Sequence, residues 1–281
     1  MKPSINQNLT LCLVAAGVLF FQLPVRAAQF PGSDAQGLQN ALTQAATVRK
    51  RERPAYPVLG ERWTNSLGQV FAPVSGTVLL FGVWDVRVQD FAAFITASGH
   101  EATGGMYSLR NATWGQHGDT WKNPGFSQGP THPVVGVSWD DANAYCLWLT
   151  EQERQEGLIS ESQSYRLPGD AEWSVAVGLD EVSGDTPKDK AGKVAGVYPW
   201  RSQWPPPDGA GNYAGSEAKD GNWPTNWPVI DGYRDGYPRT SPVGSFKANR
   251  FGLCDMGGNV WQWCTDWYDG EQKYRVLRGA S

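Results

Sequence analysis

The sequence predicts a loop-rich globular fold with few long regular helices. The chain has 33 glycines and 19 prolines, which make 52 of its 281 residues, so turns must be frequent. It also has 14 tryptophans, whose large apolar rings can hold irregular segments together. A hydrophobic content of 40% is enough to bury a core and excludes a disordered chain.

An export signal is predicted at the N-terminus, over residues 1–28. Lys2 precedes an apolar run from Leu9 to Leu23, and the small residues Ala27 and Ala28 stand at the expected cleavage offsets. The run is shorter than the ~20 residues that span a bilayer. We therefore expect a cleaved signal peptide, no membrane span after its removal, and an extracytoplasmic protein, either periplasmic or secreted.

The charge balance argues against polyanionic partners. The formal net charge is -4, and loss of residues 1–28 removes two basic side chains, Lys2 and Arg26, and makes the balance more acidic. A net negative charge does not favour binding to nucleic acid or to anionic lipid.

Residues 29–55 are predicted to form a polar helical tether outside the core, because Leu38 and Leu42 follow helical spacing. The domain proper is predicted over 56–281. A hairpin is expected near Trp63, and a buried strand within 78–83. A helix should follow, with Phe91, Phe94 and Ile95 on one face and Gly99 at its end.

In the middle of the chain, long loops are predicted to alternate with two helices. Residues 104–131 lack a sustained period and are predicted to be a loop pinned by aromatic residues, a kind of loop that is commonly functional. A strand is expected over 132–137. Ser138 and Asp141 form a capping box that opens a helix, and a second helix is expected from Asp170 to Val177. The first helix should bury Ala142, Tyr145, Cys146 and Leu149, and the second Trp173.

No other part of the chain is as dense in glycines and large aromatic residues as the stretch from Phe251 to Tyr268. Because it combines glycines with tryptophans, we expect a tight turn followed by a core strand. Residues 182–250, which precede it, are predicted to be loop-like. Oxygen-bearing side chains surround the turn: Asp255, Asn259, Gln262 and Asp266. They suggest either a calcium site or a hydrogen-bonded turn without metal.

Several spaced motifs now define a resemblance. The chain contains Ser138-Trp-Asp-Asp141, Arg166-Leu-Pro-Gly169 and Phe251-Gly-Leu-Cys-Asp-Met-Gly-Gly-Asn-Val-Trp-Gln-Trp263 in that order. From about Leu67 to Ser281 it resembles the formylglycine-generating enzyme family, also called sulfatase-modifying factors. The resemblance implies one α+β domain, a modified C-type-lectin-like architecture with little regular secondary structure, that often holds calcium.

The resemblance also implies two calcium sites. The first would use the side chains of Asp255 and Gln262 with the carbonyls of Gly258 and Val260. Family members usually have glutamate where Gln262 stands, and losing that charge should weaken the site. The second would use Asn212, the Tyr213 carbonyl, Asp235 and the Tyr237 carbonyl.

The family chemistry implied by the resemblance cannot be placed on this chain. Its members oxidise a sulfatase cysteine to Cα-formylglycine with O2 and a Cu(I) ion held by two cysteines, the soft ligands that this ion prefers. Those cysteines stand three and eight positions after the serine that matches Ser281, so we expect the domain to be C-terminally incomplete and to contain no catalytic residue. Trp261 and Ser281 match positions near the oxygen pocket, and we expect the Trp261 ring to lie in the core in either case. Cys146 matches a position usually in a disulfide, whereas Cys254 and Cys264 are expected to pack in the interior.

Three hypotheses about function remain. The first is a secreted, non-catalytic, calcium-stabilised binding or scaffold module whose partner is a sulfatase or another polypeptide. The alternative is a formylglycine-generating oxidase whose catalytic cysteines, and hence copper, come from beyond Ser281. The third is a gene fragment that does not fold stably. The spacing of the three histidines, His100, His117 and His132, argues against a zinc hydrolase.

Overall fold

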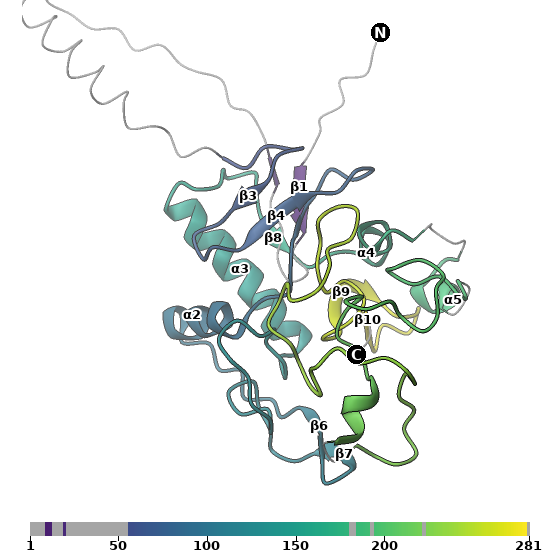
Figure 1. Cartoon of the computed structure of the whole chain (residues 1–281). Helices are drawn as coiled ribbons and strands as arrows, with labels where there is room; N and C mark the ends of the chain where they lie inside the picture. The colour runs from purple at the N-terminus through teal and green to yellow at the C-terminus, as the bar shows by residue number, and fades with distance from the viewer. Residues whose placement is uncertain are drawn as a thin grey trace, which may run out of the picture.

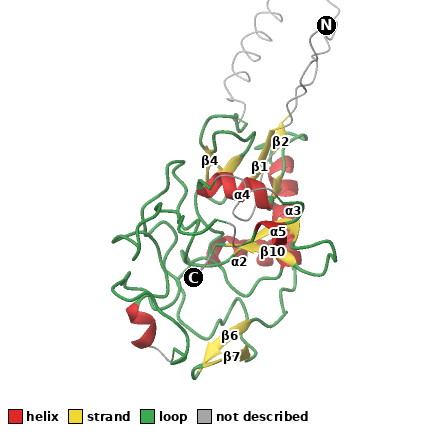
Figure 2. Ribbon diagram, turned by 90° about the vertical axis from the view of Figure 1, so that its right-hand side faces the viewer, coloured by secondary structure: helices red, strands yellow, loops and turns green. Residues whose placement is uncertain are grey.

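The computed structural model of the chain describes residues 9–12, 19–20, 56–179, 184–191, 194–220 and 223–279 (Figure 1). Short helices and strands are separated by long irregular segments, which dominate the view in Figure 2. This mixture confirms the predicted α+β, loop-rich fold class. In these ranges no helix is both long and apolar enough to cross a bilayer. The predicted tether over 29–55 lies outside the described residues.

The larger sheet has six short strands. Its main path runs through β2 (Leu19–Phe20), β1 (Leu9–Cys12), β5 (Leu80–Gly82), β4 (Val70–Pro73) and β3 (Trp63–Thr64), while β8 (Tyr165–Arg166) pairs with β1. The β3–β4 and β4–β5 pairs are antiparallel. The predicted hairpin and the predicted buried strand are both present.

Strand β1 occupies a central place in this sheet. It runs parallel to β5 and to β8, with Cys12 opposite both Phe81 and Arg166. Both β1 and β2 belong to residues 1–28, the predicted signal peptide, most of which lies outside the described residues. Removal of that segment would leave the facing edges of β5 and β8 without their common partner.

Two helices pack on the first half of the core. Helix α2 (Val88–Ser98) ends at Gly99, whose φ of 68° is the left-handed conformation that glycine adopts readily. Helix α3 (Trp139–Gln155) begins with the predicted capping box: the Ser138 hydroxyl accepts the Asp141 N–H at 3.1 Å. The buried set includes Phe71, Leu80, Phe91, Phe94, Tyr145, Cys146 and Leu149. These contacts confirm the predicted buried faces of both helices.

The second half of the core lies under the C-terminal strands. Helix α4 (Asp170–Val177) has the predicted bounds and buries Trp173. It contacts β9 (Gln262–Trp267) and β10 (Arg275–Arg278), which form an antiparallel pair. Other members of this apolar cluster are Phe81, Leu253, Met256, Cys264 and Val276. The predicted core strand after the Asp255 turn is therefore β9.

Two predictions of local structure are wrong. The segment 104–131, predicted to be a loop, contains an antiparallel hairpin of β6 (Tyr107–Arg110) and β7 (Thr113–Gln116). Its two-residue turn has positive φ at Asn111 and Ala112, as a type I′ turn requires, with alanine where glycine is usual. The predicted strand over 132–137 does not form, since a lone bridge joins Pro133 to Arg87.

The long segment from 182 to 250 is loop-like, as predicted, within its described parts. The regular pieces there are α5 (Pro187–Lys190) and a short 3-10 turn, η1 (Ser216–Asp220). Hairpin β6–β7 lies near η1 and at the opposite end of the domain from β3 and β4 (Figure 1). This end of the domain carries an aromatic cleft.

Candidate functional site

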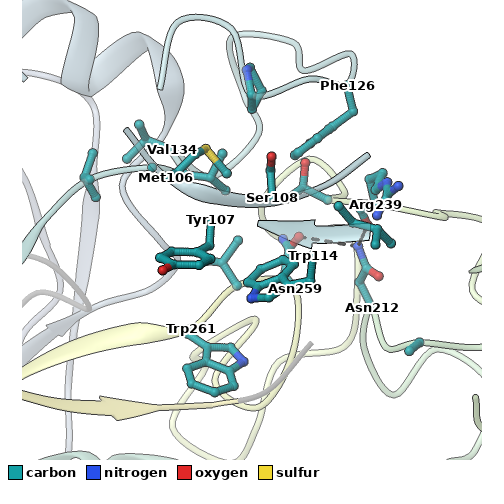
Figure 3. Close-up of a pocket in the computed structure, with 18 of the residues that line it drawn as sticks. Met106, Tyr107, Ser108, Trp114, Phe126, Val134, Asn212, Arg239, Asn259 and Trp261 are labelled. Atoms are coloured by element: carbon teal, nitrogen blue, oxygen red, sulfur yellow. Dashed lines mark hydrogen bonds between the residues drawn. The ribbon is translucent and has the colours of Figure 1, made fainter. Parts of the chain in front are cut away.

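A cleft of about 580 Å³ lies between hairpin β6–β7 and the turn that precedes β9 (Figure 3). Its walls come mainly from segments 104–109, 134–138, 212–214, 237–240 and 259–261. These segments are far apart in the sequence, so the cleft exists only in the folded chain. Its volume falls in the range of ligand-binding sites in proteins.

Aromatic side chains form one wall of the cleft. Tyr107 and Trp114 stack on each other across the hairpin, with ring centroids 6.2 Å apart, and Trp114 also contacts Trp227 at 5.8 Å. Both hairpin rings are exposed. In Figure 3 they project toward the side of the pocket where Trp261 lies. A ligand could therefore bury apolar surface against them.

The hairpin is fixed in place by a buried carboxylate. Asp119 accepts hydrogen bonds from the Ser108 hydroxyl and from the Arg110 guanidinium. The hydrogen bonds from Arg110 and then from Ser108 lower the pKa of Asp119 below its usual value, against the opposing effect of burial. A charged Asp119 thus anchors the strand that presents Tyr107.

The chemical groups of the cleft suit binding better than proton transfer. Among its described lining residues there is no cysteine, histidine, aspartate or glutamate. The one charged side chain in that lining is Arg239, whose guanidinium carbon lies 6.0 Å from the centroid of the Phe126 ring. The Asn212 amide donates to the Arg239 carbonyl at 2.5 Å. The lining therefore offers aromatic faces, amides and one cation.

Trp261 lines the cleft, but it is not a core residue. The sequence interpretation placed its ring in the core, whereas 59% of its surface is exposed. The reason is the alternation of β9, which turns Gln262 and Cys264 inward and the residues beside them outward. Ser281, the other oxygen-pocket candidate, lies outside the described residues.

The three described cysteines lie away from this cleft. Cys254 and Cys264 have free thiols, Cys146 is buried, and none of the three lines the cleft. Burial raises the pKa of Cys254 to about 11 and raises those of Cys146 and Cys264 further. A thiolate is the form that binds metal or attacks a substrate. These cysteines therefore suit packing, as the sequence predicts for Cys254 and Cys264.

The four residues of the second predicted calcium site come together around Asp235. The Asp235 carboxylate accepts the backbone N–H groups of Tyr213 and Tyr237, both at 2.8 Å, and Asn212 precedes Tyr213. Burial, followed by the nearby Glu217 carboxylate, raises the pKa of Asp235 to about 6. One buried oxygen of Glu217 has no hydrogen-bond partner among the described residues. Arg234 Nε lies 4.0 Å from this Glu217 oxygen, and the negative charge of the acidic pair is of the kind that calcium binds.

The first predicted calcium site fits less well. Asp255, Gly258, Val260 and Gln262 do share one turn, and burial raises the pKa of Asp255 to about 6. The Gln262 oxygen, however, accepts the Trp173 indole N–H at 2.6 Å. The nitrogen end of the Gln262 amide faces the turn and donates to the Asp255 carbonyl at 3.1 Å. A nitrogen donor stands where calcium requires an oxygen.

The sequence did not predict several residues of the Asp255 turn and of the cleft. Asp85, at the end of the loop after β5, is buried beside the turn and accepts the Gln262 amide at 2.8 Å. Its burial and the Asp255 charge raise the pKa of Asp85 well above its usual value. In the cleft, Tyr107 and Arg239 were missed. The available signal was the aromatic, functional character predicted for residues 104–131. No group of three or more His, Cys, Asp or Glu side chains able to hold a metal occurs in the described part of the chain.

The family model for the sulfatase-modifying factor enzyme 1-like domain matches residues 79–281, well over half of the chain. The chain belongs to the sulfatase-modifying factor family. This confirms the resemblance drawn from the motifs, and it accounts for the order in which the Ser138, Arg166 and Phe251 segments occur.

Relatives of the sulfatase-modifying factor family include enzymes and proteins named otherwise. A formylglycine-generating enzyme of Thermomonospora curvata is 30% identical over 66% of this chain and 59% of the relative. An inactive C-alpha-formylglycine-generating enzyme 2 of Bos taurus is 32% identical over 57% of this chain and 44% of the relative. The chaperone protein LppX of Paenibacillus barcinonensis is 28% identical over 63% of this chain and 67% of the relative.

Solved structures with some likeness to this sulfatase-modifying factor chain are PvdO from Pseudomonas aeruginosa and CarF. PvdO aligns over 72% of this chain and 59% of its own, with 22% identity and a TM-score of 0.45. CarF aligns over 71% of this chain and 73% of its own, with 22% identity and a TM-score of 0.40. The chain spans 59% of the length of the Thermomonospora relative.

Proposed function

We propose that this chain is an exported, non-catalytic module of the sulfatase-modifying factor family that binds an extended polypeptide segment, from a sulfatase or another protein, in its aromatic cleft. The observation that carries the proposal is the lining of the cleft. Its described residues supply aromatic faces, the amides of Asn212 and Asn259 and the Arg239 cation, without a thiol, imidazole or carboxylate. Such a set binds apolar side chains and peptide carbonyl groups.

The names of two relatives support a binding role. The bovine relative is named an inactive form of the enzyme, so the family contains members without the reaction. LppX is named a chaperone protein, and a chaperone binds polypeptide. Formylglycine-generating relatives modify a polypeptide, so a cleft that accepts one fits both kinds of member.

Calcium forms the second part of the proposal. It would bind at the Asp235 site through the side chains of Asn212 and Asp235 and the carbonyls of Tyr213 and Tyr237. Because a ligand that binds only the folded chain stabilises it, calcium would hold the loops that carry one wall of the cleft. The fit rests on the acidic pair formed by the half-buried Asp235 and the buried Glu217.

A library of random peptides displayed on phage tests the binding role. We expect the purified chain to enrich peptides with aromatic or large apolar residues. Trp114→Ala should weaken a selected peptide about tenfold, in line with the loss of an aromatic anchor. Trp204→Ala is the matched control, because Trp204 is equally exposed but does not line the cleft. Equal losses in both variants, or no enrichment, would contradict the proposal.

One observation favours the alternative function, a formylglycine-generating oxidase completed by residues after Ser281. Leu277 of β10 lines the cleft together with Trp261, so the chain leaves β10 beside the cleft. Cysteines three and eight positions after Ser281 would then have a short way to reach it. The 281-residue chain itself should convert no cysteine of a sulfatase peptide to an aldehyde, with or without added copper. Aldehyde formation by this chain would refute the non-catalytic module, and it would also show that the reaction does not need cysteines after Ser281.

A further inference from the structure

The buried amide of Gln262 links three parts of the fold at the turn before β9. It accepts from the Trp173 indole on α4 at 2.6 Å and donates to Asp85 Oδ1 at 2.8 Å and to the Asp255 carbonyl at 3.1 Å. Only 4% of the residue is exposed. All three contacts are made inside the protein.

The neighbours of this amide determine which end is oxygen and which is nitrogen. An indole N–H can only donate, so the atom that faces Trp173 must be the oxygen. A backbone carbonyl can only accept, so the atom that faces Asp255 must be the nitrogen. Both neighbours require the same orientation, and a flipped amide would break both hydrogen bonds.

This orientation disagrees with a calcium ion at the turn. Calcium binds through oxygen ligands alone, yet the group directed at the turn carries two N–H donors, whose positive ends repel a cation. Two other groups of the expected site also have partners. The Asp255 Oδ2 atom accepts the Gly244 N–H at 2.8 Å, and the Gly258 carbonyl accepts the Val260 N–H at 2.9 Å.

We propose that the Gln262 amide takes the place of a metal ion at this turn, so that the turn folds without calcium, and that glutamate at position 262 would convert it into a calcium site. One amide group joins Asp85, at the end of the segment after β5, to the turn and to α4, which is the bridging that a cation would otherwise provide. Glutamate would instead place a third carboxylate beside Asp85 and Asp255. The cluster would then need a cation to be stable when buried.

The opposing observation is a pair of buried oxygens, Asp85 Oδ2 and Asp255 Oδ1, that lack hydrogen-bond partners among the described residues. A cation held between them is the competing explanation. The test must therefore measure metal binding directly and separate this turn from the Asp235 site.

The experiment uses the purified chain with Asp235→Asn, which removes the other acidic ligand, and measures calcium by equilibrium dialysis. We expect no tightly bound calcium in this background and the same melting temperature in EDTA and in calcium. With Gln262→Glu added, we expect one bound calcium and a melting temperature that falls in EDTA and recovers with calcium. This result does not depend on the cleft, so it can fail or succeed independently of peptide binding.

Two outcomes would overturn the proposal. One is a calcium ion that binds the Asp235→Asn chain and is lost with Asp255→Asn, which would place a cation between the two partnerless oxygens. The other is a Gln262→Glu chain that folds equally well with and without calcium. If Gln262→Glu fails to fold at all, dialysis of the Asp235→Asn chain with Gln262 intact still decides between the amide and a cation.

Discussion

Glu153 accepts two hydrogen bonds from Ser66, one from its backbone N–H at 2.7 Å and one from its hydroxyl at 2.6 Å. Its second oxygen accepts the Tyr165 hydroxyl at 2.6 Å. A fully buried carboxylate on α3 therefore holds the loop before β4 and the strand β8 together. These three hydrogen bonds form one buried contact, which we call the Glu153 junction.

The Glu153 junction should make stability depend on pH. Burial raises the pKa of Glu153 above its ordinary value of 4.5, so the folded chain holds this proton more tightly than the unfolded chain does. Stability from this group is present below pH 4.5 and is lost as the pH rises through the folded-state pKa. Urea unfolding across this range should show the fall in the wild type and a flatter profile in Glu153→Gln. Parallel profiles would contradict the assignment.

Arg275→Lys should destabilise the C-terminal strand pair. The Arg275 guanidinium carbon lies 4.0 Å from the Trp139 ring centroid and 3.5 Å from that of Trp267, so a planar cation stacks with both rings. Lysine keeps the charge but not the planar stack. We expect a loss of about 1 kcal/mol in the free energy of unfolding. Lys273→Ala, at an exposed position on the same hairpin, is the control, and an equal loss there would rule out the stacking explanation.

Gly258→Ala should disturb the cleft and the Asp235 loop together. A Cβ atom at Gly258 would lie 2.5 Å from the Asn212 carbonyl oxygen and 2.9 Å from the Tyr213 ring, so the two loops must separate. We expect a loss of about 1–3 kcal/mol in unfolding free energy and weaker peptide binding. At Gly270 an added Cβ meets nothing within 4 Å, so Gly270→Ala should change neither property.

The thiols of Cys146, Cys254 and Cys264 should react slowly with Ellman's reagent at neutral pH in the folded chain. Burial holds the pKa of Cys254 at about 11 and those of Cys146 and Cys264 higher, so the thiolate fraction is very small. All thiols should react at once in denaturant. A fast-reacting thiol in the native chain would point to a reactive cysteine and weaken the non-catalytic proposal.

The sequence determined those parts of the fold that local chemistry specifies. The capping box at Ser138 and the apolar stripe behind it predicted α3, and Gly99 predicted the end of α2. The hairpin β6–β7 was missed because Asn111 and Ala112 form its turn without the usual glycine. The exposure of Trp261 was missed because it depends on which face of β9 meets the core, a tertiary property.

The candidate site could be predicted only in part for the same reason. The resemblance supplied Asn212 and Asp235, and the structure brings their segments together. It could not supply the orientation of Gln262, because that orientation is set by Trp173 on α4, distant in the sequence. Nor could it place Arg239 opposite Phe126, since no local pattern relates the two residues.

Because β1 lies within the predicted signal peptide, folding, export and signal-peptide cleavage would all affect the same sheet. If residues 1–28 direct export, a chain that folds first would hold Leu11 and Cys12 in parallel pairing with β8 and β5, where a translocase could not bind them. Export would thus require a chain that is still unfolded, and cleavage would expose two inner strand edges. Amide hydrogen exchange at Arg166 should then be faster in the processed chain than in the precursor.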